Sequence, residues 1–182
     1  MNSKTKMSKR ILSTILSFLI LLSIMPIIPI TASAADDYLI YTANDLMNFA
    51  KQVNSGRKST NGKLMANINM AGKVWEPILD YAGTFNGQGY SISNLTMTIK
   101  GEGCFGMFGK VNGATIKDFS LTGSVTSNRT VNSNFNYGRI IGWSDGNTTL
   151  LRVHSAVNFT SYDNTYKDKV GGLNRSRSEQ YS

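Results

Sequence analysis

A glycine-punctuated segment recurs in the second half of the sequence, and this recurrence constrains the fold more than any other feature. The corresponding positions are Gly109 and Gly142, Gly113 and Gly146, Ile116 and Leu150, and Phe119 and Val153. A third copy begins at residues 170–173. Self-similarity at a fixed period is typical of solenoids, because one short unit cannot bury its apolar face alone and must stack on its neighbours.

The residues between the apolar stretches indicate what each unit contains. They are rich in Gly, Asn, Ser and Thr. This composition predicts many short strands joined by tight turns, because glycine and asparagine tolerate turn conformations. Stacked in parallel around one interior, such coils form a parallel β-helix, so the predicted fold class is all-β. We expect Phe108, Ile116 and Ile141 to share that interior.

Individual strands are predicted ahead of the repeat. Residues 63–70 alternate between apolar and polar side chains, which indicates one strand. Residues 74–78 form a short extended piece with a bend or edge at Pro77. The sequence Asn-Gly-Gln-Gly at 86–89 predicts a turn, and residues 90–99 predict a strand whose register slips near Asn94.

One helix is predicted near the start of the repeat region. Thr42 can cap it, with Asp45 in the acidic position of a capping box. Gly56 is expected to end it. Such a helix would cover the open end of the sheet stack. Its apolar stripe is formed by Leu46, Phe49, Ala50 and Val53.

Four motifs occur in order along the first coils. They are Leu-Met-Ala-Asn-Ile-Asn-Met at 64–70, Trp-Glu-Pro-Ile at 75–78, Tyr-Ala-Gly-Thr-Phe-Asn-Gly-Gln-Gly-Tyr-Ser-Ile-Ser-Asn-Leu at 81–95 and Gly-Cys-Phe-Gly-Met-Phe-Gly at 103–109. Together they resemble the opening coils of bacterial surface proteins with GLUG repeats, which also occur in immunoglobulin-A peptidases and large adhesins. The resemblance covers residues 41–173. It implies a right-handed parallel β-helix in an exported, usually much larger, surface protein, and it implies no particular reaction.

This chain departs from the GLUG pattern at several turns. The family has carboxylates where this chain has Asn67, Asn69 and Asn86, and glycine where it has Leu79. Amides in place of carboxylates argue against calcium bound at these turns. We therefore expect no metal and no cofactor.

The first 34 residues have the pattern of a secretory signal peptide. Basic residues at positions 4, 6, 9 and 10 precede an apolar stretch at 11–24, and small residues offer cleavage after Ala34 or, as second choice, Ala35. A retained membrane anchor over residues 11–30 is the alternative, but the prolines at 26 and 29 argue against it. The mature chain is thus expected to be secreted or at the cell surface, with no membrane segment.

Cleavage also changes the charge balance. It lowers the formal net charge from +8 to +4, and the remaining basic residues form no run with interleaved aromatics. Nucleic acid is therefore not an expected partner.

The predicted organisation has four parts. Residues 1–34 are the signal peptide, 35–62 a linker with the capping helix, 63–173 the β-helix repeat domain, and 174–182 a polar C-terminal tail. Either the polar tail shields the exposed edge of an open last coil, or the chain is a truncated product of a longer gene. An open coil exposes unpaired backbone groups and predicts self-association.

No catalytic constellation is found, and we expect the chain not to be an enzyme. Asp118 and Asp145 stand singly beside turns, and His154 has no acid or nucleophile near it in the sequence. Cys104, the single cysteine, is expected to be buried packing. A polysaccharide-active enzyme would return as a hypothesis if two carboxylates lay within about 10 Å on one exposed face.

Aromatic residues with neighbouring amides are frequent after residue 134. They either fill the interior or form a platform for sugars. We therefore keep three hypotheses: an adhesion or interaction module for a glycan or a host or matrix surface, a structural spacer, and the enzyme. A binding site of the first kind would lie in loops such as residues 126–136. The aromatics are Phe135, Tyr137, Trp143, Phe159, Tyr162 and Tyr166.

Overall fold

A computed structural model describes residues 37–127, 135–161 and 174–176. The predicted signal peptide and its cleavage site lie outside the described residues. In the described part the chain is mostly β with one short helix. The elements are β1 (Tyr38–Ile40), α2 (Ala43–Asn54), β2 (Gly62–Leu64), β3 (Ile68–Asn69), β4 (Thr84–Asn86), β5 (Ser91–Ile99), β6 (Gly103–Phe105), β7 (Phe108–Asn112), β8 (Thr115–Ser127), β9 (Phe135–Tyr137), β10 (Ile141–Asp145), β11 (Thr149–Ser161) and β12 (Asn174–Ser176).

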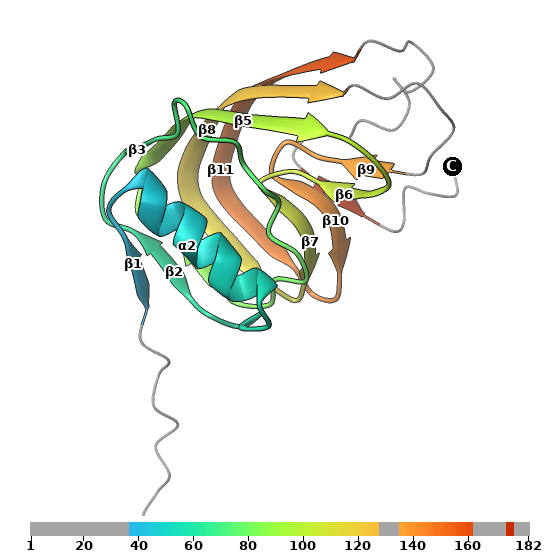
Figure 1. Ribbon diagram of the computed structural model, residues 1–182. Coiled ribbons are helices and arrows are strands. Elements are labelled where there is room, and N and C mark those ends of the chain that lie inside the picture. Colours follow the sequence, from blue (N-terminus) through green and yellow to red (C-terminus); the bar gives the residue numbers. More distant parts are fainter. Residues whose placement is uncertain (1–36, 128–134, 162–173, 177–182) are drawn as a thin grey trace, which may run out of the picture. The chain divides into compact units, whose positions relative to one another are not determined.

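The strands form three sheets, and the pairings recorded for the described strands are all parallel. The largest sheet has the order β1-β2-β4-β8-β5-β3, with β11 also paired to β8. The others are β12-β10-β7 and β6-β9. The large sheet is strongly curled, as the long β8 and β11 in Figure 1 show. Both β4 and β5 pair with β8, because a turn interrupts the strand in the preceding layer.

The strand register confirms the repeat seen in the sequence. Ile116 on β8 pairs with Leu150 on β11, and Phe119 pairs with Val153. In the second sheet, β7 and β10 pair so that each position of one copy faces the corresponding position of the next. The repeat therefore corresponds to stacked layers of parallel strands.

These layers share one core. Phe108, Ile116 and Ile141 are each 0% exposed and belong to one hydrophobic cluster, as the sequence predicted. The ring of Phe85 lies 5.4 Å, centroid to centroid, from the rings of Phe108 and Phe119. Side chains from several layers thus pack against one another in the interior.

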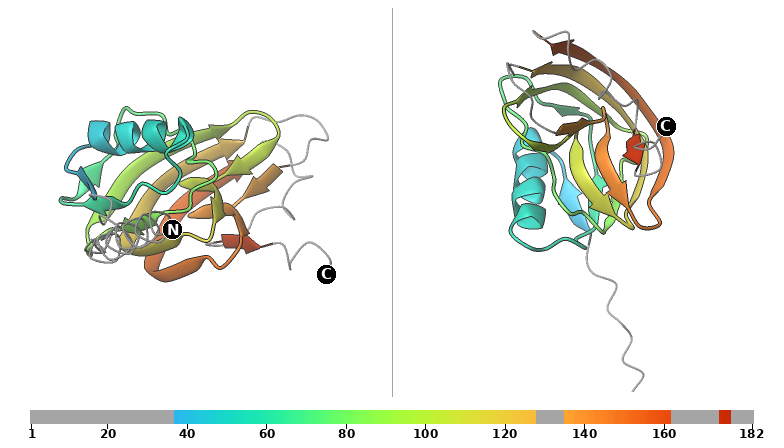
Figure 2. Two further views of the ribbon diagram at one scale, coloured as in Figure 1. Left: turned by 90° about the horizontal axis from the view of Figure 1, so that it is seen from below. Right: turned by 90° about the vertical axis from the view of Figure 1, so that its right-hand side faces the viewer.

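The helix has the predicted boundaries and packing. Thr42 and Asp45 form a reciprocal capping box, in which the Asp45 backbone N–H donates to the Thr42 hydroxyl and the Asp45 carboxylate accepts from the Thr42 backbone N–H. The four stripe residues of α2 are buried. Gly56 follows the helix with a φ of 111°, as expected for its end. Figure 2 shows α2 at one end of the stacked strands and β11 at the other.

The strand predicted over residues 63–70 is divided in the structure. Residues 63–70 form two short strands, β2 and β3, because the chain turns a corner between them while Leu64, Ile68 and Met70 all stay buried. Residues 174–176, at the start of the predicted polar tail, form strand β12, in which Asn174 pairs with Ile141 of β10. The slip near Asn94 is confirmed, since β5 changes register against β8 between Ile92 and Leu95.

Candidate functional site

One corner of the layers carries a column of residues with a left-handed backbone. Gln88, Asp118 and Arg152 have φ angles of 51°, 63° and 49°. They lie in successive layers, because Lys117 pairs with β4 on one side and with β11 on the other. Residues other than glycine, asparagine and aspartate rarely adopt this backbone conformation. The corner nevertheless holds two long polar side chains.

The turn at Gln88 is shaped by its close approach to the next layer. A Cβ atom on Gly87 would lie 2.6 Å from the Asp118 carbonyl oxygen, so only glycine fits there. The backbone N–H of Gly89 donates to the same carbonyl at 2.7 Å. The Asn86 side-chain oxygen accepts from the Gln88 backbone N–H at 3.0 Å.

Two side chains of this column form hydrogen bonds with the preceding layer. Gln88 Nε2 donates to the Leu64 carbonyl oxygen at 2.6 Å. Arg152 Nε donates to Asp118 Oδ1 at 2.5 Å. The Arg152 hydrogen bond holds the pKa of the Asp118 carboxyl below its usual range, and it raises the pKa of the guanidinium. Both groups are therefore charged near neutral pH.

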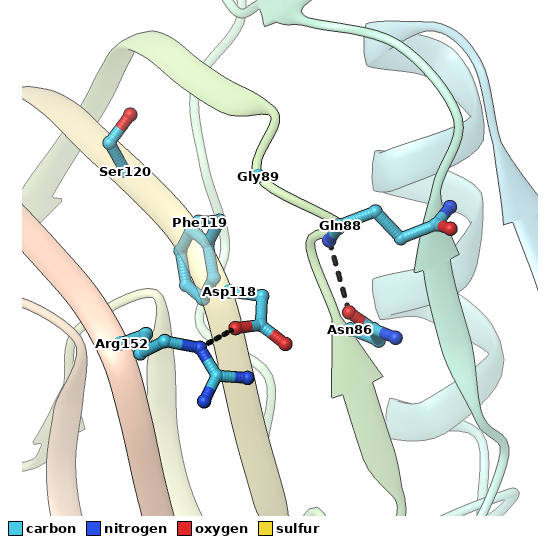
Figure 3. A pocket seen from close by; sticks show the side chains of 7 residues that line it. All are labelled: Asn86, Gln88, Gly89, Asp118, Phe119, Ser120 and Arg152. Atoms are coloured by element: carbon cyan, nitrogen blue, oxygen red, sulfur yellow. Dashed lines mark hydrogen bonds and ion pairs between the residues drawn. The ribbon is translucent and has the colours of Figure 1, made fainter.

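These residues line an open surface cavity of about 680 Å³. Figure 3 shows the Asp118 and Arg152 side chains extending toward each other from β8 and β11, beside the turn that carries Asn86 and Gln88. The Arg152 side chain is 65% exposed and that of Asp118 is 20% exposed. The lining residues are Asn86, Gln88, Gly89, Asp118, Phe119, Ser120 and Arg152. This corner cavity is the candidate functional site.

The amides that replace the carboxylates of the GLUG pattern bind turn groups. Asn67 Oδ1 accepts from the Ser91 backbone N–H at 2.9 Å, and Asn69 Oδ1 accepts from Asn94 Nδ2 at the same distance. Asn86 caps the Gln88 turn. All three amide oxygens therefore have structural partners in this fold.

A second charged cluster lies on a different turn. Lys58 Nζ is 3.1 Å from Asp80 Oδ2, and Lys110 Nζ is 3.4 Å from Asp80 Oδ1 and 3.8 Å from Asp145 Oδ2. Asp80 and Asp145 stand singly in the sequence but bind the same lysine in space. The hydrogen bond from Lys58 holds the pKa of the Asp80 carboxyl below its usual range.

The remaining residues that the sequence singled out do not converge. Cys104 is half-buried, not fully buried as predicted, because β6 belongs to a two-stranded sheet and, among the described strands, pairs only on one side, where Cys104 lies opposite Asn136 of β9. Burial raises the pKa of its thiol. His154 is exposed on β11 and pairs in register with Ser120, which lines the corner cavity.

Three of the aromatic side chains after position 134 are described, and all three are at least half-buried. Tyr137 is 0% exposed and stacks on the half-buried Phe159 with ring centroids 4.8 Å apart, so this pair packs at the margin of the interior. Trp143 is half-buried. Tyr162 and Tyr166 lie outside the described residues, as does most of the loop at 126–136.

The corner column itself was missed by sequence reasoning. Gln88 falls within a predicted turn, but Asp118 and Arg152 lie inside long strands and carry no glycine or asparagine signal. Asp118 and Arg152 each follow the predicted equivalent positions Ile116 and Leu150 by two residues. The predicted repeat therefore places them side by side on neighbouring layers and could have revealed the pair.

The described residues hold neither a cluster of metal ligands nor a membrane-spanning helix. Within the ranges 37–127, 135–161 and 174–176, no group of three or more His, Cys, Asp or Glu residues is placed to hold a metal ion. In the same ranges, no helix is long and apolar enough to cross a membrane.

The described part of the chain is thus a mostly β fold of parallel strands with one short helix and a common core. The chain is similar to halomucin of Haloquadratum walsbyi, with 29% identity over 145 residues, covering 75% of this chain and 2% of halomucin. The similarity is therefore distant and partial, to a segment of a large surface or secreted repeat protein. No family model matches the chain, and no solved structure gives a significant match. The assignment to GLUG repeats thus stays a prediction.

Proposed function

We propose that this chain is a right-handed parallel β-helix segment of GLUG type in an exported surface protein, and that it serves adhesion to, or interaction with, a glycan or another extracellular surface. The observation that carries this proposal is the division of the fold between a shared apolar interior and polar corners with an open cavity. A rigid stack with exposed polar turns is suited to contact with partners. The distant similarity to halomucin supports an extracellular location.

The proposed partners follow from the same surface. We expect a surface glycan or an extracellular protein, with no nucleic acid, no cofactor and no membrane contact after signal cleavage. Self-association is also expected, because the outer edge of β11 has no partner strand in the described ranges and its Leu151 is 42% exposed.

One specific observation favours the enzyme hypothesis. Asp80 and Asp145 both lie within 4 Å of Lys110 Nζ, so they fall inside the carboxylate separation of about 10 Å that glycosidases use. A glycosidase also needs one carboxyl that remains protonated near neutral pH. Asp80 is unsuited to that role, because Lys58 lowers its pKa. Our proposal remains a binding protein and not an enzyme.

A binding screen tests the proposal. The secreted chain is applied to arrays of glycans and extracellular matrix proteins, with the heat-unfolded chain and an unrelated exported β domain as controls. Saturable binding by the folded chain alone is expected. A folded chain that binds nothing on either array would instead favour the structural spacer.

Light scattering tests the self-association. The apparent mass is expected to rise with protein concentration, and Leu151→Lys is expected to reduce the rise by placing a charge beside the free strand edge. A clean monomer over a wide concentration range would contradict this part of the proposal.

A further inference from the structure

We propose that the corner cavity binds a neutral oligosaccharide through the paired side chains of Asp118 and Arg152. This inference rests on the proposed function as an interaction module, and it names the class of ligand and the residues that hold it. Within the described residues, the cavity combines an ion pair, an amide and a hydroxyl around one open space.

The ion pair leaves one side of each partner available. Arg152 uses Nε for Asp118 Oδ1, and no bond to the two terminal guanidinium nitrogens or to Asp118 Oδ2 is recorded among the described residues. A guanidinium carries five N–H donors, and each carboxylate oxygen accepts hydrogen bonds. The pair therefore offers a free acceptor next to free donors; Figure 3 shows the bond from Arg152 Nε and the remaining polar atoms of both groups.

Sugar hydroxyls match this arrangement. A hydroxyl both donates and accepts. One hydroxyl of a vicinal pair can donate to Asp118 Oδ2 while its neighbour accepts from the Arg152 guanidinium. Such charge-assisted hydrogen bonds are stronger than those between neutral groups.

The charge of the pair favours a neutral ligand. An anion attracted by Arg152 would meet the Asp118 carboxylate, and a cation attracted by Asp118 would meet the guanidinium. Lys117 adds one positive charge nearby, which also lowers the pKa of Asp118. Acidic sugars and a simple anion are therefore the proper competitors in a test.

Other lining groups complete the cavity. Asn86 engages its oxygen with Gln88 and keeps its amide nitrogen as a donor, and Ser120 supplies a partly exposed hydroxyl. Phe119 is 3% exposed and forms part of the floor, not a platform on which a sugar ring could stack. The volume of about 680 Å³ lies within the usual range for small-molecule sites, about 300–1,000 Å³.

The backbone at this corner supports a role beyond structure. Glycine or asparagine would satisfy the left-handed conformation at positions 88 and 152 with less strain. Residues held in sparsely populated conformations often lie at ligand sites. The hydrogen bond between Arg152 and Asp118 also fixes both side chains before a ligand arrives, which reduces the entropy lost on binding.

The experiment titrates the secreted chain by calorimetry with named probes. These are neutral gluco-, manno- and galacto-oligosaccharides, an oligogalacturonate, and inorganic sulfate. The variants are Asp118→Asn and Arg152→Asn, since asparagine tolerates the left-handed backbone, and Arg152→Lys, which keeps the charge without the planar donor pair. Asn158→Ala, an exposed change on β11 at a position paired with Ser124 and outside the cavity, is the matched control.

A neutral oligosaccharide is expected to bind, with affinity falling at least about tenfold in the three site variants and changing less than about twofold in the control. Thermal unfolding of each variant verifies that it folds. If oligogalacturonate or sulfate binds more tightly and Asp118→Asn strengthens that binding, the cavity is an anion site and the inference is wrong.

Two further outcomes separate this inference from the proposed function. Glycan binding that survives all three variants, or binding to matrix proteins alone, overturns the corner site and leaves the interaction module intact. A folded chain that binds neither glycans nor matrix proteins overturns both.

Discussion

The interior side chains are covered to different extents at the two ends of the described strand stack. At the first end, α2 places Phe49 with its ring centroid 5.8 Å from that of Phe85 and 5.9 Å from that of Tyr81, and all three side chains are fully buried. At the β11 end, the interior side chains Leu150 and Phe159 are only partly buried. Residues of the same repeat thus differ in burial according to what lies above them.

Matched positions make the comparison direct. Ile116 and Leu150 pair in register on adjacent strands, yet Ile116 is 0% exposed and Leu150 is half-buried. Val125 and Phe159 show the same contrast. Burial in this architecture is therefore supplied by the next layer, as expected where stability is the sum of units and their interfaces.

The largest predicted effect compares one aromatic residue at each end. Phe49→Ala is expected to lower the free energy of unfolding by about 3–5 kcal/mol, because it opens a cavity between the helix and the interior. Phe159→Ala is expected to cost less than half as much, since water already reaches its position. Urea unfolding followed by circular dichroism measures both, and equal losses would show that the β11 end is covered in solution.

The next prediction uses one repeat position in two layers. Ile116→Ala is expected to cost about 2–5 kcal/mol, the range for a buried aliphatic residue, and Leu150→Ala about 1 kcal/mol. The same unfolding measurement applies, with Leu151→Ala on the outward face of β11 as control. A larger loss for Leu150 than for Ile116 would contradict the assigned order of the layers.

The sequence predicted those parts of the fold whose signals are local. Thr42, Asp45 and the apolar stripe lie within one helix, so α2 could be placed closely. The bend between β2 and β3 was missed because Leu64 and Ile68 are buried on both sides of it, and alternation alone does not reveal a corner. Periodicity thus identified the layers better than their corners.

The candidate site was harder to predict, because its residues come from different layers. Arg152 and Asp118 are far apart in the sequence and meet only through the register of β11 on β8. Asp80 and Asp145 likewise meet at Lys110. Carboxylates that stand alone in a repeat sequence can therefore lie close together in space, and aligning the layers by their strand register shows which ones do.

A smaller effect concerns the helix that covers the first end. Thr42→Ala removes the hydroxyl that accepts from the Asp45 backbone N–H, and a loss of about 1 kcal/mol is expected. Thr42→Ser keeps the hydroxyl and should lose much less. Thermal unfolding measures both variants; if the two lose equally, the cap does not contribute and the helix is held by packing alone.

The smallest effect is pH-dependent and compares an ion pair near each end. Asp80 pairs with Lys58, which follows α2, and Asp118 pairs with Arg152 on β11. In both, the basic partner lowers the pKa of the carboxyl in the folded chain. The stabilisation is therefore complete above the unfolded pKa of about 3.9 and is lost as the pH falls through the lower folded pKa.

Thermal unfolding of the native chain, Asp80→Asn and Asp118→Asn from neutral to strongly acidic pH tests this. Each variant is expected to unfold at a slightly lower temperature than the native chain near neutral pH, and the difference should vanish in acid, where the native carboxyl is protonated as well. Because Lys110 is a second partner for Asp80, the difference should be larger for Asp80→Asn than for Asp118→Asn. A difference that persists in acid would assign the effect of the substitution to packing or backbone conformation, and the ion pairs would then not distinguish the covered end from the open one.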